Sequence, residues 1–206
     1  MLTLVLGGAR SGKSQFAESL IASRAAAVPS ATTVPSATTV PSATTVPSVT
    51  ADPVSAVSYV ATARPYVTPD PDFEERVRLH RERRPDSWET VDEEDLVNYL
   101  PHASRFSLVD DLGTWLTHKF DVGGWEDAPQ QAIDELLAAL RALPSDTTVV
   151  IVSPEVGLSI IPEHRSARLF RDTLGLLNAQ VAQLCDDVYF VAAGLPIQLK
   201  PAKPIA

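Results

Sequence analysis

Residues 2–14 read LTLVLGGARSGKS, and this stretch decides the fold. Leu2–Leu6 is a short apolar run that predicts a buried strand, and two glycines end it. Gly7–Ser14 then matches the phosphate-binding pattern G-x-x-x-x-G-K-S/T. Four apolar residues at helical spacing follow it, namely Phe16, Ala17, Leu20 and Ile21. A glycine-rich loop between a strand and a helix is the context that this pattern requires, so the stretch predicts a phosphate-binding loop.

The residue types of this loop suit the phosphates of a nucleotide. Glycines let backbone N–H groups turn inward around phosphate oxygens, and the amino terminus of the following helix adds positive potential. Lys13 would reach the β- and γ-phosphates, and the Ser14 hydroxyl would bind Mg²⁺. The predicted nucleotide-binding residues of the loop are Gly7, Gly8, Ala9, Arg10, Ser11, Gly12, Lys13 and Ser14. The alternative, a glycine turn with a chance lysine, does not explain why strand, loop and helix occur together.

A second acid is needed to orient the Mg²⁺ shell, and we expect it on a strand that neighbours the first. The run Phe106–Val109 predicts a strand, and Asp110 stands at its end. Asp110 is therefore the predicted second magnesium ligand. Either Asp110 or the adjacent Asp111 would also serve as an ordinary residue of a strand-end turn, so position alone leaves the role of the pair open.

The rest of the chain alternates short apolar runs with amphipathic segments. Further strands are expected at 57–61, 147–152 and 188–192, with a small tail strand at 197–200. Helices are expected from Asp70-Pro71 to Arg84, around 133–140, and from Pro162-Glu163 to Leu184. Strands that alternate with helices imply an α/β fold with a mostly parallel central sheet and helices on both faces.

Composition excludes several classes of protein. The 206 residues carry a net charge of −9, with 45% hydrophobic residues and a pI near 4.8. Such an acidic chain argues against a nucleic-acid binder with a broad basic surface. The lone Cys185 excludes an internal disulfide framework, and with four scattered histidines it argues against a structural zinc site. No basic segment precedes the first apolar run and no run suits a membrane span, so we expect a soluble, cytoplasmic protein.

A low-complexity insertion interrupts the chain at about residues 27–53. The hexapeptide PSATTV occurs three times in register, at 29–34, 35–40 and 41–46, and a fourth copy begins at Pro47. Proline every six residues breaks helices, and Ser, Thr and Ala offer little to bury, so we expect disorder. A solenoid is disfavoured, because it would need larger apolar residues facing inward. The Ser, Thr and Pro content leaves a partner-binding linker or a glycosylated stalk as alternatives to plain disorder. Residues 1–206 are thus expected to form one catalytic domain with this insertion.

A charged segment, EERVRLHRERR at 74–84, carries the histidine of interest. Glu and Arg at i, i+4 spacing form a solvated helix face. His80 instead shares a face with Phe73 and Val77, and Arg81, Arg83 and Arg84 follow it. Taken alone, such a histidine is most often a packed or capping residue, although imidazole suits nucleophilic and acid–base chemistry.

Several segments together make the sequence recognisable. They are GGARSGKS at 7–14, YVATA at 59–63, RVRLHRERRPDSW at 76–88, LVD at 108–110, EVGLSIIPE at 155–163 and RLFRD at 168–172. In combination they resemble the bifunctional adenosylcobinamide kinase / adenosylcobinamide-phosphate guanylyltransferase family of cobalamin biosynthesis. The resemblance extends over nearly the whole chain except the PSATTV insertion.

The resemblance implies a RecA-like P-loop fold and two reactions with Mg²⁺, GTP and ATP. The first phosphorylates adenosylcobinamide, and the second transfers GMP from GTP to adenosylcobinamide phosphate, releasing pyrophosphate. It implies that His80 is the catalytic residue, which forms a covalent guanylyl intermediate. It also implies further nucleotide-binding residues, namely Ala61, Thr62, Ala63, Arg81, Glu82, Arg83, Arg84, Asp92 and Asp110. It further implies a homo-oligomer, with a trimer as one form.

Two other functions stay open at this point. A simple P-loop small-molecule kinase without a covalent step would explain the phosphate loop and Asp110, but it leaves the His80 segment without a role. A non-catalytic, regulatory RecA-like NTPase would hydrolyse nucleotide without any need for cobinamide.

Overall fold

The computed structural model describes residues 1–27, 57–63, 71–82 and 84–201. Its strands are β1 (Leu2–Gly7), β2 (Val57–Ala61), β3 (Glu89–Val91), β4 (Phe106–Asp110), β5 (Thr148–Pro154), β6 (Asp187–Ala192) and β7 (Leu195–Lys200). Its helices are α1 (Lys13–Ala26), α2 (Pro71–Glu82), α3 (Leu96–Tyr99), α4 (Leu112–Gly123), α5 (Gln130–Arg141) and α6 (Arg165–Leu184), with a 3₁₀ turn at Leu100–His102. The PSATTV insertion lies outside the described residues.

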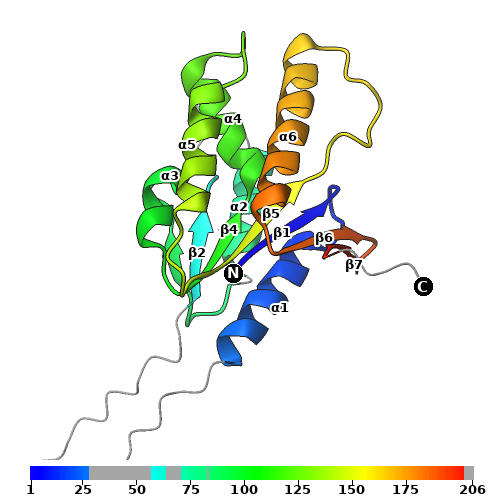
Figure 1. Cartoon of the computed structure of the whole chain (residues 1–206). Coiled ribbons are helices and arrows are strands. Elements are labelled where there is room, and N and C mark those ends of the chain that lie inside the picture. Colours follow the sequence, from blue (N-terminus) through cyan, green and yellow to red (C-terminus); the bar gives the residue numbers. More distant parts are fainter. Residues whose placement is uncertain (28–56, 64–70, 83, 202–206) are drawn as a thin grey trace, which may run out of the picture.

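The strands form one sheet in the order β3-β2-β4-β5-β1-β6-β7 (Figure 1). Every neighbouring pair is parallel except β6 and β7, which form an antiparallel hairpin. The predicted α/β fold, with a mostly parallel sheet and a short tail strand, is therefore confirmed. Because the strands from β3 to β6 are parallel, their carboxyl ends share one edge of the sheet, where ligands of such folds bind.

The expectation that the strand of Asp110 neighbours the first strand is wrong. After β4 the chain crosses over through α4 and α5, and the returning strand β5 inserts between β4 and β1. Adjacent strands lie about 4.8 Å apart, so β1 and β4 are separated by about 10 Å. The phosphate loop and Asp110 consequently share an edge of the sheet without being on adjacent strands.

Two apolar clusters cover the two faces of the sheet, because strand residues alternate between faces. On one face, Val5, Tyr59 and Leu108 pack with Ala17 and Ile21 of α1. On the other face, Leu4, Val60 and Val109 of the same strands pack with residues of the helices α3, α4, α5 and α6. The helix residues include Leu116 and Phe120 of α4, Leu136 of α5 and Leu177 of α6. Figure 1 shows α1 on the side of the sheet away from α5 and α6. This division places α1 and the phosphate loop before it on one face.

Helix α4 is the largest element that the sequence pattern did not predict. Its buried residues Leu112, Trp115, Leu116 and Phe120 recur at helical spacing. Asp111 caps it, since the Asp111 carboxylate accepts from Thr114 N–H in a capping box. The short elements β3 and α3 were also missed, and α6 begins at Arg165 rather than at Pro162-Glu163, with His164 as its capping residue. None of these differences changes the fold class.

Within the described ranges, no helix combines the length and the apolar character needed to cross a membrane.

Candidate active site

The phosphate loop turns directly from the end of β1 into α1. Gly12 precedes α1 with φ +91°, a left-handed conformation that favours glycine. A Cβ built on Gly7 would lie 2.5 Å from Ser11 Oγ, so the loop closes only over a residue without a side chain. The Lys13 ammonium lies 3.5 Å from the carbonyl of Gly8, folded back over the loop. The glycines thus allow the tight turn that the sequence pattern predicts.

Both neighbouring strands of β1 support this loop through backbone hydrogen bonds. Gly194, in the turn between β6 and β7, donates to the carbonyl of Ser11 with N···O 2.8 Å. Glu155, directly after β5, donates to the carbonyl of Gly7 with N···O 3.0 Å. The conformation of the phosphate loop therefore depends on segments far along the chain.

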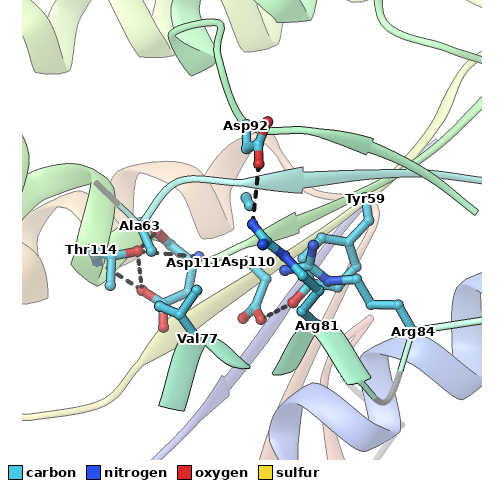
Figure 2. A pocket seen from close by; sticks show the side chains of 10 residues that line it. Tyr59, Ala63, Val77, Arg81, Arg84, Asp92, Asp110, Asp111 and Thr114 are labelled. Atoms are coloured by element: carbon cyan, nitrogen blue, oxygen red, sulfur yellow. Dashed lines mark hydrogen bonds and ion pairs between the residues drawn. The ribbon is translucent and has the colours of Figure 1, made fainter. Parts of the chain in front are cut away.

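A pocket opens at the same edge of the sheet, beyond the ends of β2 and β4 and against α2 (Figure 2). It is lined by Tyr59, Ala61, Ala63, Val77, Arg81, Arg84, Asp92, Asp110, Asp111 and Thr114. Six residues predicted to bind nucleotide are therefore brought together here: Ala61, Ala63, Arg81, Arg84, Asp92 and Asp110. The phosphate-loop residues Gly7–Ser14 do not line this pocket.

Tyr59 and Asp110 are joined at the base of the pocket. The register pairs Tyr59 with Leu108 and Ala61 with Asp110, so Tyr59 and Asp110 are diagonal neighbours on one face of the sheet. The Tyr59 hydroxyl donates a hydrogen bond to Asp110 Oδ2. Burial, followed by the nearby Asp110 carboxylate, raises the pKa of Tyr59 far above its usual value, so the phenol stays a donor.

The guanidinium of Arg84 lies over one face of the Tyr59 ring. Its guanidinium carbon lies 3.7 Å from the ring centroid, a cation–π geometry. Arg84 Nη1 also donates to Thr90 Oγ1 at 3.3 Å, whereas the buried Nε has no hydrogen-bond partner among the described residues. A buried cationic donor of this kind suits an anionic ligand such as a phosphate group.

The other charged residues of this region are more exposed. Arg81 and Asp92 form an ion pair at 3.6 Å, and their side chains are 67% and 43% exposed. An exposed pair of this length contributes little to stability, so both groups can turn to a ligand at little cost. Glu82 pairs with Arg78 on the exposed face of α2 rather than lining the pocket.

Asp111 points away from Asp110 and closes the start of α4. Its Oδ1 accepts from Thr114 N–H at 2.8 Å, and its own N–H donates to Thr62 Oγ1 at 2.9 Å. Burial and the adjacent Asp110 raise the pKa of Asp111, although hydrogen bonds from Thr114 and the charge of Lys13 oppose the rise. Thr62 is buried, and its hydroxyl is occupied by this network instead of facing the pocket.

The histidine predicted to be catalytic lies in the last turn of α2. Val77 and Arg81 of the same helix line the pocket, and His80 stands between them in the chain. The side chain of His80 lies outside the described part of the structure, as does the whole of Arg83. Four lining residues, Tyr59, Val77, Asp111 and Thr114, were not predicted as site residues. For Tyr59 the signal was the two-residue alternation with Ala61 along one strand.

The donors predicted for Mg²⁺ have suitable chemistry. The Ser14 hydroxyl and the Asp110 carboxylate supply the hard oxygen ligands that this ion prefers. In the described part of the chain, no three His, Cys, Asp or Glu side chains gather into a metal cluster. Such a site would therefore need phosphate oxygens and water to complete an octahedral shell, which is usual for Mg²⁺.

The fold and the loop together define a class of protein. A parallel α/β sheet whose first strand runs through G-x-x-x-x-G-K-S into a helix is the architecture of the P-loop nucleotide-binding proteins. Residues 45–199 match the family model described as cobinamide kinase / cobinamide phosphate guanyltransferase, and the chain belongs to this family.

Curated relatives extend the similarity over almost the entire chain. The chain is similar to the bifunctional adenosylcobalamin biosynthesis protein CobU of Escherichia coli strain K12, at 33% identity over 97% of this chain and 100% of that protein. It is also similar to the bifunctional adenosylcobalamin biosynthesis protein CobP of Pseudomonas aeruginosa PAO1, at 34% identity over 97% of this chain and 98% of that protein. The protein CobU of Salmonella typhimurium LT2 is 30% identical over 97% of this chain and 100% of that protein. At 97% coverage the similarity also reaches the phosphate loop, which lies before the residues that the family model matches.

Proposed function

We propose that this protein catalyses both reactions of its family. It phosphorylates adenosylcobinamide from GTP or ATP, and it transfers GMP from GTP to adenosylcobinamide phosphate. The observation that supports this best is that a phosphate loop and a second pocket, lined by two arginines and three aspartates, lie at one edge of the sheet in a chain that belongs to this family. A kinase alone would need only the first of these.

For the kinase reaction, the phosphate loop binds the nucleotide. Its backbone N–H groups surround the phosphates, and the Lys13 ammonium stabilises charge on the β- and γ-phosphates. The acceptor hydroxyl attacks the γ-phosphorus, the bond from that phosphorus to the bridging oxygen breaks, and the nucleoside diphosphate leaves. Asp110 or Asp111, which line the pocket at the same edge of the sheet, would accept the hydroxyl proton.

For the guanylyl transfer, His80 acts as nucleophile. One imidazole nitrogen forms a bond to the α-phosphorus of GTP, and pyrophosphate leaves. An oxygen of adenosylcobinamide phosphate then attacks the same phosphorus and the P–N bond breaks, which regenerates the imidazole. The arginines at 81, 83 and 84 would stabilise the phosphate charges. Ala61, Ala63 and Asp92 line the same pocket and would contact the rest of the nucleotide, whereas Thr62 and Glu82, also predicted to bind nucleotide, do not line it.

Mg²⁺ fits this arrangement through the chain's own oxygen donors. Ser14 and Asp110 would hold it, and it would neutralise charge on the phosphates of the bound nucleotide. Metal titration of the nucleotide complex, compared between the wild type and Asp110→Asn, measures the contribution of Asp110.

The setting of the enzyme is part of the proposal. We place it in the cytoplasm, where its nucleotide substrates are abundant, and as a homo-oligomer such as a trimer. The apolar side chains of Leu195, Ile197 and Leu199 are exposed along β7, which supports an assembly contact. Light scattering with size-exclusion chromatography measures the mass in solution, and a monomer at micromolar concentration would refute the assembly.

Labelled GTP tests the function. With α-labelled GTP and the metal, we expect acid-labile label on the wild type and none on His80→Ala, whereas His102→Ala, which changes an exposed histidine paired with Glu94, should label normally. With γ-labelled GTP and adenosylcobinamide, His80→Ala should still form adenosylcobinamide phosphate. An unlabelled wild type, or a His80→Ala variant that keeps guanylyl transfer, would refute the covalent mechanism. Failure to phosphorylate adenosylcobinamide would refute the kinase reaction.

A further inference from the structure

We propose that Tyr59 is a positioning residue of this site, and this inference rests on the proposed function. Its hydroxyl holds the carboxylate of Asp110 and its ring holds the guanidinium of Arg84 (Figure 2). A single side chain therefore sets the separation between an acid assigned to the metal and a cation assigned to the phosphates.

The hydroxyl contact restricts one residue of the site. Asp110 is the last residue of β4, and its backbone is paired with Ala61 of β2 and Val152 of β5. The hydrogen bond from Tyr59 occupies Oδ2, so the carboxylate is held in one rotamer with Oδ1 as its other oxygen. Partners of this kind orient metal ligands, and their removal typically costs about 10–100-fold in metal affinity or activity.

The ring contact restricts the other residue. Arg84 lies between α2 and β3 and belongs to neither element, so side-chain contacts rather than a regular backbone place its guanidinium. The Tyr59 ring lies 3.7 Å away and Thr90 Oγ1 lies 3.3 Å from Nη1. With the guanidinium plane supported in this way, Nε remains the donor without a partner among the described residues.

Tyr59 itself is rigidly held. Its side chain is 1% exposed and belongs to the apolar cluster under α1. The ring of Trp88 packs beside it with centroids 6.4 Å apart. A group that orients others must itself be fixed by packing, and Tyr59 meets that requirement.

Tyr99 provides a matched control, because a buried tyrosine can also be merely structural. It is 4% exposed, and its hydroxyl is hydrogen-bonded to Ser107 Oγ at 2.8 Å and to Ser104 N–H at 3.2 Å. It lies in the apolar cluster on the opposite face of the sheet and does not line the pocket. Loss of either hydroxyl should cost similar stability, but only Tyr59 should affect the site.

The experiment compares Tyr59→Phe with Tyr99→Phe in the full chain. The first readout is the affinity of Mn²⁺ for the protein–GTP complex, measured by electron paramagnetic resonance, and the second is GTP affinity in EDTA. We expect Tyr59→Phe to weaken Mn²⁺ binding by about tenfold and to reduce kcat for adenosylcobinamide phosphorylation to a similar extent. Metal-free GTP affinity should stay within about twofold of the wild type. Tyr59→Leu, which removes the ring, should also weaken metal-free GTP binding by about fivefold. Tyr99→Phe should leave all three quantities within about twofold.

A double-mutant cycle tests whether the effect passes through Asp110. In the Asp110→Asn background, Tyr59→Phe should cause no further loss of Mn²⁺ affinity, because the group that it orients is gone. Losses that add in full, or a Tyr59→Phe variant indistinguishable from Tyr99→Phe, would overturn the inference. Should Tyr59→Leu fail to fold, Tyr59→Phe decides alone. An active wild type with no effect of Tyr59→Phe refutes this inference only, whereas a wild type that binds GTP and Mn²⁺ but transfers neither group refutes the proposed function only.

Discussion

The backbone N–H of Gly194 donates to the carbonyl of Ser11 with N···O 2.8 Å, so the turn of the β6–β7 hairpin is hydrogen-bonded to the phosphate loop. The approach is close, because a Cβ built on Gly12 would lie 3.2 Å from the Cα of Gly194. The tail hairpin, which contributes no residue to the pocket, is in this way a support for nucleotide binding.

Gly12→Ala should therefore damage both folding and binding. Alanine at φ +91° is strained by about 1–2 kcal/mol, and its methyl group would press on Gly194. We expect the free energy of unfolding to fall by about that amount, and GTP affinity to fall about tenfold or more. Denaturant unfolding and GTP titration measure the two effects. The control is Gly175→Ala in α6, where a Cβ meets nothing within 4 Å and should raise stability by about 1 kcal/mol.

Lys13→Ala should abolish phosphoryl transfer with little effect on stability. Its ammonium lies on the loop, 3.5 Å from the carbonyl of Gly8, and a phosphate-loop lysine acts mainly on the transferred phosphoryl group. We expect a loss of at least about 100-fold in the rate of adenosylcobinamide phosphorylation, which corresponds to about 3 kcal/mol of activation energy. Lys200→Ala, which removes contacts to the carbonyls of Ala182 and Gln183, should keep activity within about twofold. Equal losses in the two variants would contradict the assigned role.

Asp95 should make stability depend on pH. Burial opposes ionisation, but hydrogen bonds from Lys119 and Val97 N–H outweigh it and lower the pKa of Asp95. Because the folded-state pKa lies below the unfolded value of about 4, the stabilisation is fully present above that value and is lost as pH falls through the folded pKa. Asp95→Asn should cost about 1 kcal/mol at pH 7 and progressively less below pH 4, since asparagine keeps the helix cap.

Urea unfolding of the wild type and Asp95→Asn between pH 3 and pH 7 measures this gap. Asp127→Asn, on the exposed segment before α5, is the control and should show no gap at any pH. A gap for Asp95→Asn that widens on acidification would reverse the expected sign.

Deletion of Pro29–Thr50 should leave both activities within about threefold. The segment joins the end of α1 to the start of β2, and helix-to-strand connections in a parallel sheet lie at the edge opposite the pocket. The connection between Ala27 and Val57 shortens from 29 residues to 7, which lowers the loop-closure cost by about 1 kcal/mol. A folded deletion variant that loses tenfold in either reaction would show that the repeat takes part in catalysis.

Apolar periodicity predicted most of the sheet and most of the larger helices. Strand Val57–Ala61 was predicted to the residue, and β1, β4, β5 and β6 to within two residues at each end. The short strand β3 was missed because Glu89 and Thr90 are exposed at the sheet edge, which leaves no apolar run. Helix α4 carries the helical spacing, but Gly113, Thr114 and Thr117 lower its intrinsic propensity and obscured the pattern.

The site was less predictable than the fold, because it depends on strand order. The sequence placed Asp110 at a strand end, but nothing in it showed that β5 would separate that strand from β1. Tyr59 lies in a predicted strand and in the YVATA segment, and neither pattern assigns it a role in the site. Its partner is 51 positions away, and only the pairing of β2 with β4 brings the hydroxyl to that carboxylate. Diagonal contacts across strands follow from register, which local patterns do not encode.

The position of β1 has a consequence for synthesis of the protein. β1 lies between β5 and β6 in Figure 1, yet these partners follow it by roughly 140 and 180 residues. At ribosomal rates of about 5–20 residues per second, the earliest strand waits on the order of 10–40 s before the middle of the sheet can assemble. Throughout that interval the nascent chain exposes an apolar strand with unpaired edges, so the yield of folded protein is expected to depend on chaperones that cover such segments during synthesis.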